Sequence, residues 1–88
     1  MDISAVINLY NVLEENEVLR IELINRSKIY CLPKDKLDTH AETNTLNLLK
    51  PLNGVNQRII IDGNSIVVIC TMSRQTYDLK LQRGELYV

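Results

Sequence analysis

The stretch that decides the fold spans residues 58–72 and reads RIIIDGNSIVVICTM. Its two apolar runs lie on either side of Gly63 and consist mostly of isoleucine and valine. β-Branched residues favour strands, and a glycine between two such runs favours a tight hairpin turn. The segment therefore predicts a β-hairpin with one strand over 58–62 and the other over 65–72.

The two strands of this hairpin do not alternate between apolar and polar residues. A strand that is apolar on both faces is normally covered on both sides. An N-terminal helix can cover one face; the other face requires a second helix over 40–50, closure into a barrel, or another protein chain. Each such side chain that stays exposed loses the stabilisation of about 1.5–3 kcal/mol that its burial would give. We therefore expect the hairpin to contribute to a protein interface, through Ile59, Ile61, Ile66 and Val68.

The N-terminal third predicts a helix followed by a first hairpin. Apolar residues recur at three- and four-residue spacing over 3–13, which is typical of an amphipathic helix, and Asp2 can cap its first turn. From Glu17 the apolar residues alternate with polar ones, and the polar segment 25–28 separates this pattern from a second apolar run at 29–32. We therefore predict a strand on each side of that turn.

The middle segment predicts a short second helix over 39–50. Thr39 and Glu42 have the spacing of a capping box, in which each side chain satisfies a free amide of the first turn. Pro51 disfavours helical geometry in the residue before it, so the helix should end near residue 50.

The C-terminal segment predicts strands. Apolar and polar residues alternate over 77–82, and residues 86–88 predict an edge strand. The predicted fold class is α+β in a single domain over 1–88. Its order is an N-terminal amphipathic helix, a β-hairpin, a short second helix, and an antiparallel meander that forms a small sheet or a partly open barrel.

Composition and charge restrict the function classes. The chain has 88 residues, 45% of them hydrophobic, and a net charge of -1, which gives no sign of a polyanion partner. Its longest apolar run, residues 66–70, is too short to span a membrane, and no basic leader precedes the first apolar residues. We therefore expect a cytoplasmic protein without a membrane partner, in which Cys31 and Cys70 stay reduced.

The sequence offers little catalytic chemistry. If this segment were extended, His40 would share a face with Asp38 and Glu42 and form a weak candidate metal site. In a helix the three side chains would not lie on one face. Cys31 and Cys70 lie in apolar runs, where thiols are usually unreactive. All three glycines lie at predicted turns that need a positive φ, and none forms a phosphate-binding loop: Gly54, Gly63 and Gly84. We expect no enzymatic activity, no metal and no cofactor.

The remaining hypothesis is a non-catalytic protein–protein interaction module that self-associates and acts as an adaptor, inhibitor or assembly component. Residues 1–24 carry five acidic side chains and one basic one, and Glu14, Glu15 and Glu17 could dock a basic partner. The alternative is a small barrel that binds single-stranded nucleic acid through basic and aromatic side chains, namely Lys28, Tyr30, Arg74, Lys80 and Arg83.

Overall fold

The computed structural model describes residues 1–52 and 54–86. Its elements, in chain order, are α1 (Ile3–Asn11), β1 (Glu17–Leu23), β2 (Lys28–Cys31), β3 (Lys36–His40), β4 (Thr45–Leu52), β5 (Val55–Asp62), the 3₁₀ turn η1 (Gly63–Ser65), β6 (Ile66–Ser73) and α2 (Arg74–Gln82). The predicted α+β class is confirmed. The described strands form two separate antiparallel sheets and do not close into a barrel.

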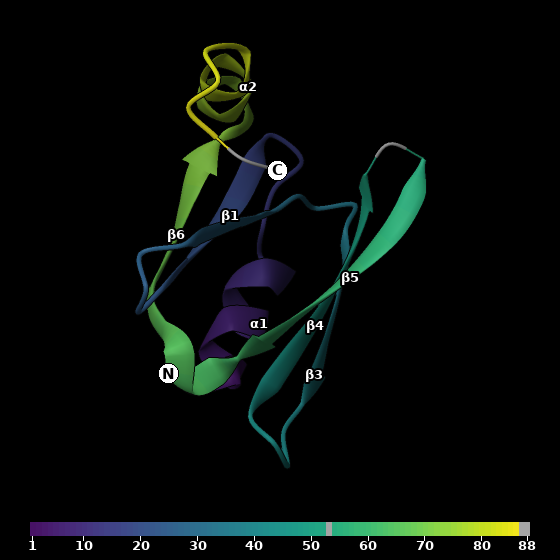
Figure 1. The fold of residues 1–88 in the computed structure, drawn as a ribbon, viewed down its shortest axis with the longest axis vertical. Coiled ribbons are helices and arrows are strands. Elements are labelled where there is room, and N and C mark those ends of the chain that lie inside the picture. The colour runs from purple at the N-terminus through teal and green to yellow at the C-terminus, as the bar shows by residue number, and fades with distance from the viewer. Residues whose placement is uncertain (53, 87–88) are drawn as a thin grey trace.

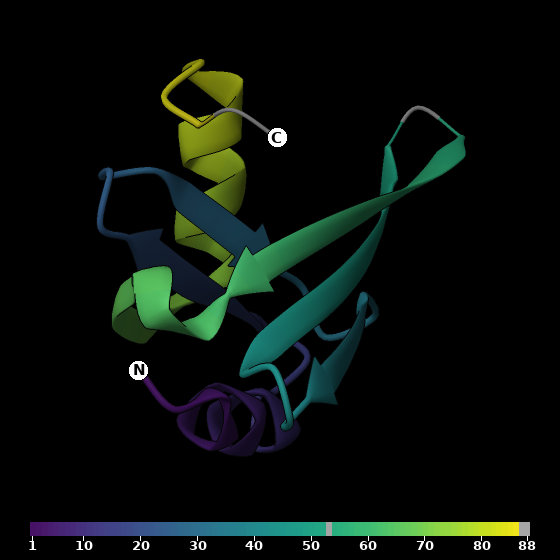
Figure 2. The ribbon, with the colours of Figure 1, turned by 60° about the horizontal axis from the view of Figure 1, so that its bottom comes forward.

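The first sheet has the strand order β2-β1-β6, and the second has the order β3-β4-β5. Helix α1 lies beside both sheets, whereas α2 continues directly from the end of β6 at the opposite end of the fold (Figure 1). Figure 2 shows the β4–β5 hairpin projecting away from the rest of the chain. The two sheets are therefore joined mainly near α1.

The main core forms where α1 meets both sheets. It combines residues of α1, of the first sheet and of the second sheet, all buried: Ile3, Val6, Leu19, Ile21, Cys31, Leu37, Leu46, Leu48, Ile61 and Ile66. A second cluster packs α2 against the other face of the first sheet, through Val18, Tyr30, Leu32 and Tyr77. The aliphatic residues of the sequence thus fill two distinct apolar centres.

The N-terminal predictions are confirmed. The Asp2 carboxylate accepts a hydrogen bond from the amide of Ser4 at 2.9 Å, and α1 begins directly after it. Strands β1 and β2 pair antiparallel, with Leu19 opposite Cys31. Both features depend on residues close together in the chain, which is why their sequence signals suffice.

The predicted hairpin over 58–72 is wrong, although both of its strands exist. Strand β5 pairs with β4, and β6 pairs with β1, so the two strands belong to different sheets. Residues Gly63–Ser65 form a 3₁₀ turn, with the Asp62 carboxylate accepting from the amide of Asn64 at 3.0 Å. Gly63 does not have a positive φ; a Cβ there would lie 2.7 Å from the carbonyl oxygen of Asn44. Close packing therefore explains this glycine.

The predicted helix over 39–50 is also wrong, because β3 and β4 form a hairpin through this segment. Asn44 has a φ of 50° in the connecting turn, a left-handed conformation that ends helical geometry and that asparagine tolerates. Its side-chain oxygen accepts from the amide of Ile3 at 3.1 Å, which fastens the turn to α1. Thr39 lies within β3, so the capping box does not form.

The predicted strand over 77–82 is wrong as well, since these residues lie in helix α2. The Ser73 hydroxyl accepts from the amide of Thr76 at 3.1 Å and caps the helix. Tyr77 and Leu81 are four residues apart, so they also fit one helical face, and both pack against the second core cluster. Of the predicted edge strand, Leu86 lies in no regular element, and 87–88 lie outside the described residues.

Candidate protein-interaction edge

Each sheet has two edge strands, and an edge strand presents unpaired backbone groups that can accept a strand from another chain. Proteins block such edges with charged side chains, prolines or bulges, or cover them with other elements. The edges are β2 and β6 in the first sheet and β3 and β5 in the second. What protects each edge therefore indicates where another chain could add.

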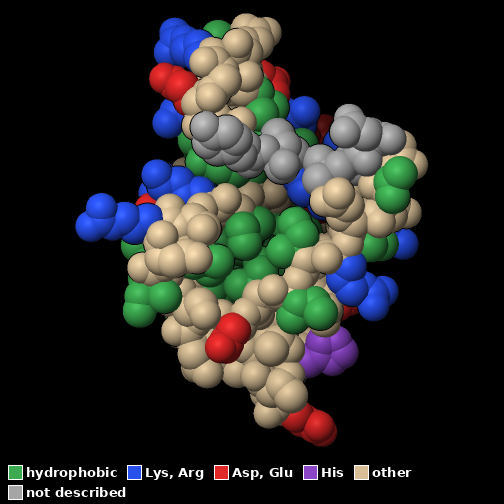
Figure 3. Space-filling model, viewed as in Figure 1, with side chains coloured by type: hydrophobic (Ala, Val, Ile, Leu, Met, Phe, Trp, Pro, Cys, Tyr) green, Lys and Arg blue, Asp and Glu red, His purple; other side chains and the backbone are tan. Residues whose placement is uncertain are grey.

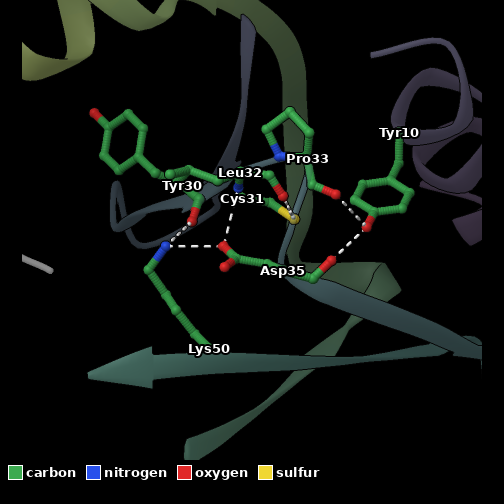
Figure 4. Close-up of polar contacts among 7 residues, drawn as sticks. All are labelled: Tyr10, Tyr30, Cys31, Leu32, Pro33, Asp35 and Lys50. Carbon is green, nitrogen blue, oxygen red and sulfur yellow. Dashed lines mark hydrogen bonds and ion pairs between the residues drawn. The ribbon is translucent and has the colours of Figure 1, made fainter. Parts of the chain in front are cut away.

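A buried ion pair binds the C-terminal end of the β2 edge (Figure 4), and the exposed Lys28 lies at the start of this strand. The Lys50 ammonium lies 3.0 Å from the Asp35 carboxylate and also donates to the carbonyl oxygen of Tyr30 at 3.0 Å. The same carboxylate accepts from the amide of Leu32 at 3.0 Å. The exposed fractions of the Lys50 and Asp35 side chains are 9% and 3%. Backbone groups at and just after the end of β2 are thus bound within the chain.

Two further side chains complete this network. The Tyr10 hydroxyl donates to the carbonyl oxygens of Pro33 and Asp35, which joins α1 to the loop after β2 (Figure 4). Burial raises the pKa of Tyr10 above its ordinary value. Burial, assisted by the negative charge of Asp35, raises the pKa of the Cys31 thiol to about 12. Cys31 is therefore protonated at neutral pH and is not an activated nucleophile.

The second sheet has charged side chains on both of its edges. Lys36 and Asp38 are exposed on β3, and Arg58 and Asp62 are exposed on β5. Charges at an edge disfavour pairing with another chain, because pairing would bring them close to that chain or remove them from water.

Strand β6 has a different edge. A bulge at its start leaves Val67 without a partner in β1, and from Val68 to Ser73 the pairing with β1 is regular. This regular part, VICTMS, contains neither a charged residue nor a proline. Among the described residues only β1 pairs with β6. Val67 and Val68 are exposed, at 47% and 38%. The edge from Val68 to Ser73, here called the β6 edge, thus lacks the charges that mark the other three.

The structure separates the apolar residues that the sequence assigned to an interface. Ile61 and Ile66 lie in the core, at 2% and 3% exposure, while Ile59 is half-buried against it. Val68 is exposed on the β6 edge. The sequence analysis missed Ile60, which is 68% exposed, because a run of three consecutive isoleucines does not show which face of the strand is buried.

The predicted acidic patch lies at the C-terminal end of β6. Glu17 is opposite Ser73 in the β1–β6 ladder, and its carboxylate accepts from the amide of Glu14 at 3.1 Å. Glu14 and Glu15 are exposed. Arg74 is a nearby cation, but its guanidinium lies 3.0 Å from the Asp78 carboxylate. One end of the β6 edge is therefore acidic.

The residues of the nucleic-acid alternative do not form a stacking surface. Tyr30 is buried, and its ring lies 5.5 Å from that of Tyr77. Arg74 covers the Tyr77 ring and is held by Asp78, while Lys28 lies 3.9 Å from Glu22. Lys80 lies on α2, and Arg83 follows that helix. Bases need exposed aromatic rings to stack on, and the Tyr30 ring is already packed inside the fold.

Other surface features are modest. Figure 3 shows apolar side chains gathered in the middle of one face. A pocket of about 70 Å³ lies between Ile29, Ile59 and Tyr77, well below the volume of roughly 300–1,000 Å³ typical of small-molecule sites. Larger hollows, of about 540 Å³ beside Asp2 and about 460 Å³ beside Thr39, are open to solvent. Asp38 and His40 lie on an extended strand, yet the described residues contain no group of three or more side chains able to hold a metal ion.

No protein-family model matches the chain, and neither the curated proteins nor the solved structures compared with it give a match. Neither helix in the described part of the chain is long and apolar enough to cross a membrane.

Proposed function

We propose that this protein is a non-catalytic protein–protein interaction module that binds a strand of another chain along the β6 edge. The observation that carries the proposal is the contrast among the four sheet edges. Charged side chains lie along β3 and β5, and β2 carries the exposed Lys28 and is bound at its end by a buried ion pair, whereas Val68 to Ser73 is uncharged and regular. Strand addition of this kind obtains affinity from main-chain hydrogen bonds and selectivity from alternate side chains.

The side chains of β6 support this mode of binding. An added strand would cover Val68 on one face of the first sheet and Thr71 on the other, because successive residues of a strand point to opposite faces. Covering a partly exposed valine contributes on the order of 1 kcal/mol. Additional ladder hydrogen bonds contribute about 0.5–1.5 kcal/mol each. Together, the burial of side chains and the ladder hydrogen bonds favour a partner strand made of apolar, β-branched residues.

In the test, a library of displayed octapeptides is selected for binding to the full chain. The chain is tethered to a surface at low density, so that its copies stay apart from one another. We expect enrichment of apolar, β-branched peptides. Their dissociation constants should rise by about tenfold or more when Val68→Lys and Thr71→Lys are combined, because lysines at an edge oppose strand addition. Both positions are exposed, so the variant should keep its fold, which circular dichroism checks.

The matched control is Ile60→Lys, the same kind of substitution at a more exposed position on the β5 edge. It should leave peptide binding unchanged. Peptides that bind the β6 double variant as tightly as the natural chain, or a selection that enriches none, would contradict strand addition at β6.

A further inference from the structure

We infer that the strand added at β6 comes from a second copy of this chain, paired antiparallel about a twofold axis. The inference rests on the proposed function and names the partner of that same edge. The product would be one continuous sheet with the order β2-β1-β6-β6-β1-β2, in which the edge left at each end is β2, whose C-terminal end is bound by Lys50 and Asp35. Such an assembly is closed and does not propagate into a filament.

Symmetry restricts the register of this pairing. When a twofold axis relates two antiparallel strands of one sheet, it is perpendicular to the sheet. It passes midway between one residue and the same residue of the second copy, which lies directly opposite. The bulge at Val67 limits regular pairing to Val68–Ser73. Two registers give the longest pairing inside that limit. In one, Cys70 lies at the axis opposite Cys70 of the second copy; in the other, Thr71 lies at the axis opposite Thr71 of the second copy. With Cys70 on the axis, Val68 lies opposite Met72 of the second copy.

Charge favours the antiparallel direction. Glu14, Glu15 and Glu17 lie at the Ser73 end of the β6 edge. A parallel pairing would bring both acidic patches together. An antiparallel pairing centred on Cys70 separates the two Ser73 residues by about 20 Å along the strands, well beyond the screening length of about 8–10 Å.

The opposite end of β6 suits the acidic patch of a second copy. The amide of Ile24 donates to the carbonyl oxygen of Ser65 at 2.8 Å, so the turn between β1 and β2 lies beside the start of β6. That turn carries Arg26, which is exposed. Antiparallel pairing therefore places the acidic patch of each copy at the same end of the joined sheet as Arg26 of the other copy, at a lateral separation of about three strand spacings, so that opposite charges weakly favour self-association.

The first measurement is analytical ultracentrifugation of the full chain across a concentration series. We expect a monomer–dimer equilibrium. Combining Val68→Lys with Thr71→Lys should raise the dimer dissociation constant by about tenfold or more, because it places like charges near the axis, whereas Ile60→Lys should not change it.

The second measurement uses disulfide formation to determine direction and register. Residues directly opposite in an antiparallel pair have Cα atoms about 4.5–5.5 Å apart, within the range that a disulfide spans. Mild oxidation should therefore give a covalent dimer either of the natural chain, through Cys70, or of Thr71→Cys in a Cys70→Ser background. Cys70→Ser alone should give none, because Cys31 is buried. Ser73→Cys in the same background should also give none.

A chain that stays monomeric at every concentration, or a Ser73→Cys variant that cross-links as well as the central positions, would overturn the inference. Selected peptides that still bind the β6 edge of a monomeric chain would leave the proposed function standing with a different partner. Absence of both dimer and peptide binding would refute both proposals.

Discussion

Replacing Lys50 with methionine should strongly destabilise the fold. The substitution keeps most of the side-chain volume but removes the ammonium that lies 3.0 Å from Asp35 and 3.0 Å from the carbonyl oxygen of Tyr30. The Asp35 carboxylate, 3% exposed, would retain the amide of Leu32 as its donor and lose its countercharge. Breaking a buried pair in this way costs about 3–5 kcal/mol, because one charge remains buried without compensation.

That loss is a large share of the 5–15 kcal/mol typical of natural domains. Urea denaturation followed by circular dichroism measures it, and the melting temperature should fall by at least about 12 °C, at roughly 4 °C per kcal/mol for a chain of this size. Adding Asp35→Asn to Lys50→Met should cost less than the sum of the two single changes, because the second substitution removes the uncompensated charge.

The matched control is Lys28→Met. Lys28 also faces a carboxylate, that of Glu22 at 3.9 Å, but both side chains are substantially exposed. Exposed pairs contribute about 0–1 kcal/mol, so this variant should unfold nearly as the natural chain does. A Lys50→Met loss below about 1 kcal/mol, no larger than that of the control, would show that the buried ion pair contributes no more to stability than an exposed one.

Three further outcomes follow from the packing. Gly63→Ala should cost about 1–3 kcal/mol in urea unfolding, because its Cβ would lie 2.7 Å from Asn44; an unchanged midpoint would refute the close approach. In the native chain, at a concentration low enough to keep it monomeric, iodoacetamide should modify the half-buried Cys70 and leave the buried Cys31 unmodified until urea unfolds the protein, as mass spectrometry would show. Because burial raises the pKa of the Cys31 thiol from 9.0 to about 12, the native state holds that proton more tightly than the unfolded state. The resulting contribution of Cys31 to the free energy of unfolding is complete below pH 9 and falls as pH rises toward 12. The free energy of unfolding of Cys31→Ala should therefore decrease less steeply with rising pH than that of the natural chain. An equal slope in the two proteins would count against this assignment.

The successes and failures of sequence reasoning follow the range of the interactions involved. The Asp2 cap and the β1–β2 turn depend on residues close in the chain, and both are confirmed. At Tyr77 and Leu81 the apolar spacing fits a strand and a helix equally well. The Ser73 cap and packing against the second core cluster favour the helix, and only the folded chain shows that packing.

The candidate site shows the same division. The excess of isoleucine and valine over 59–70 correctly marked two strands, but not their partners. Ile61 and Ile66, predicted at an interface, are buried, because β5 and β6 separate into different sheets. The Lys50–Asp35 pair had no sequence signal, since two charged residues fifteen positions apart are ordinary in a solvent-exposed surface.

By itself, the sequence determined the α+β class, the first helix and hairpin, and the location of the apolar excess, because each depends on local propensity and periodicity. The tertiary structure decided which strands pair, why Gly63 must lack a side chain, and which edge stays uncharged and regular. Those outcomes depend on contacts between distant segments, such as β1 with β6 and Gly63 with Asn44, whose geometry exists only once the sheets and α1 have packed.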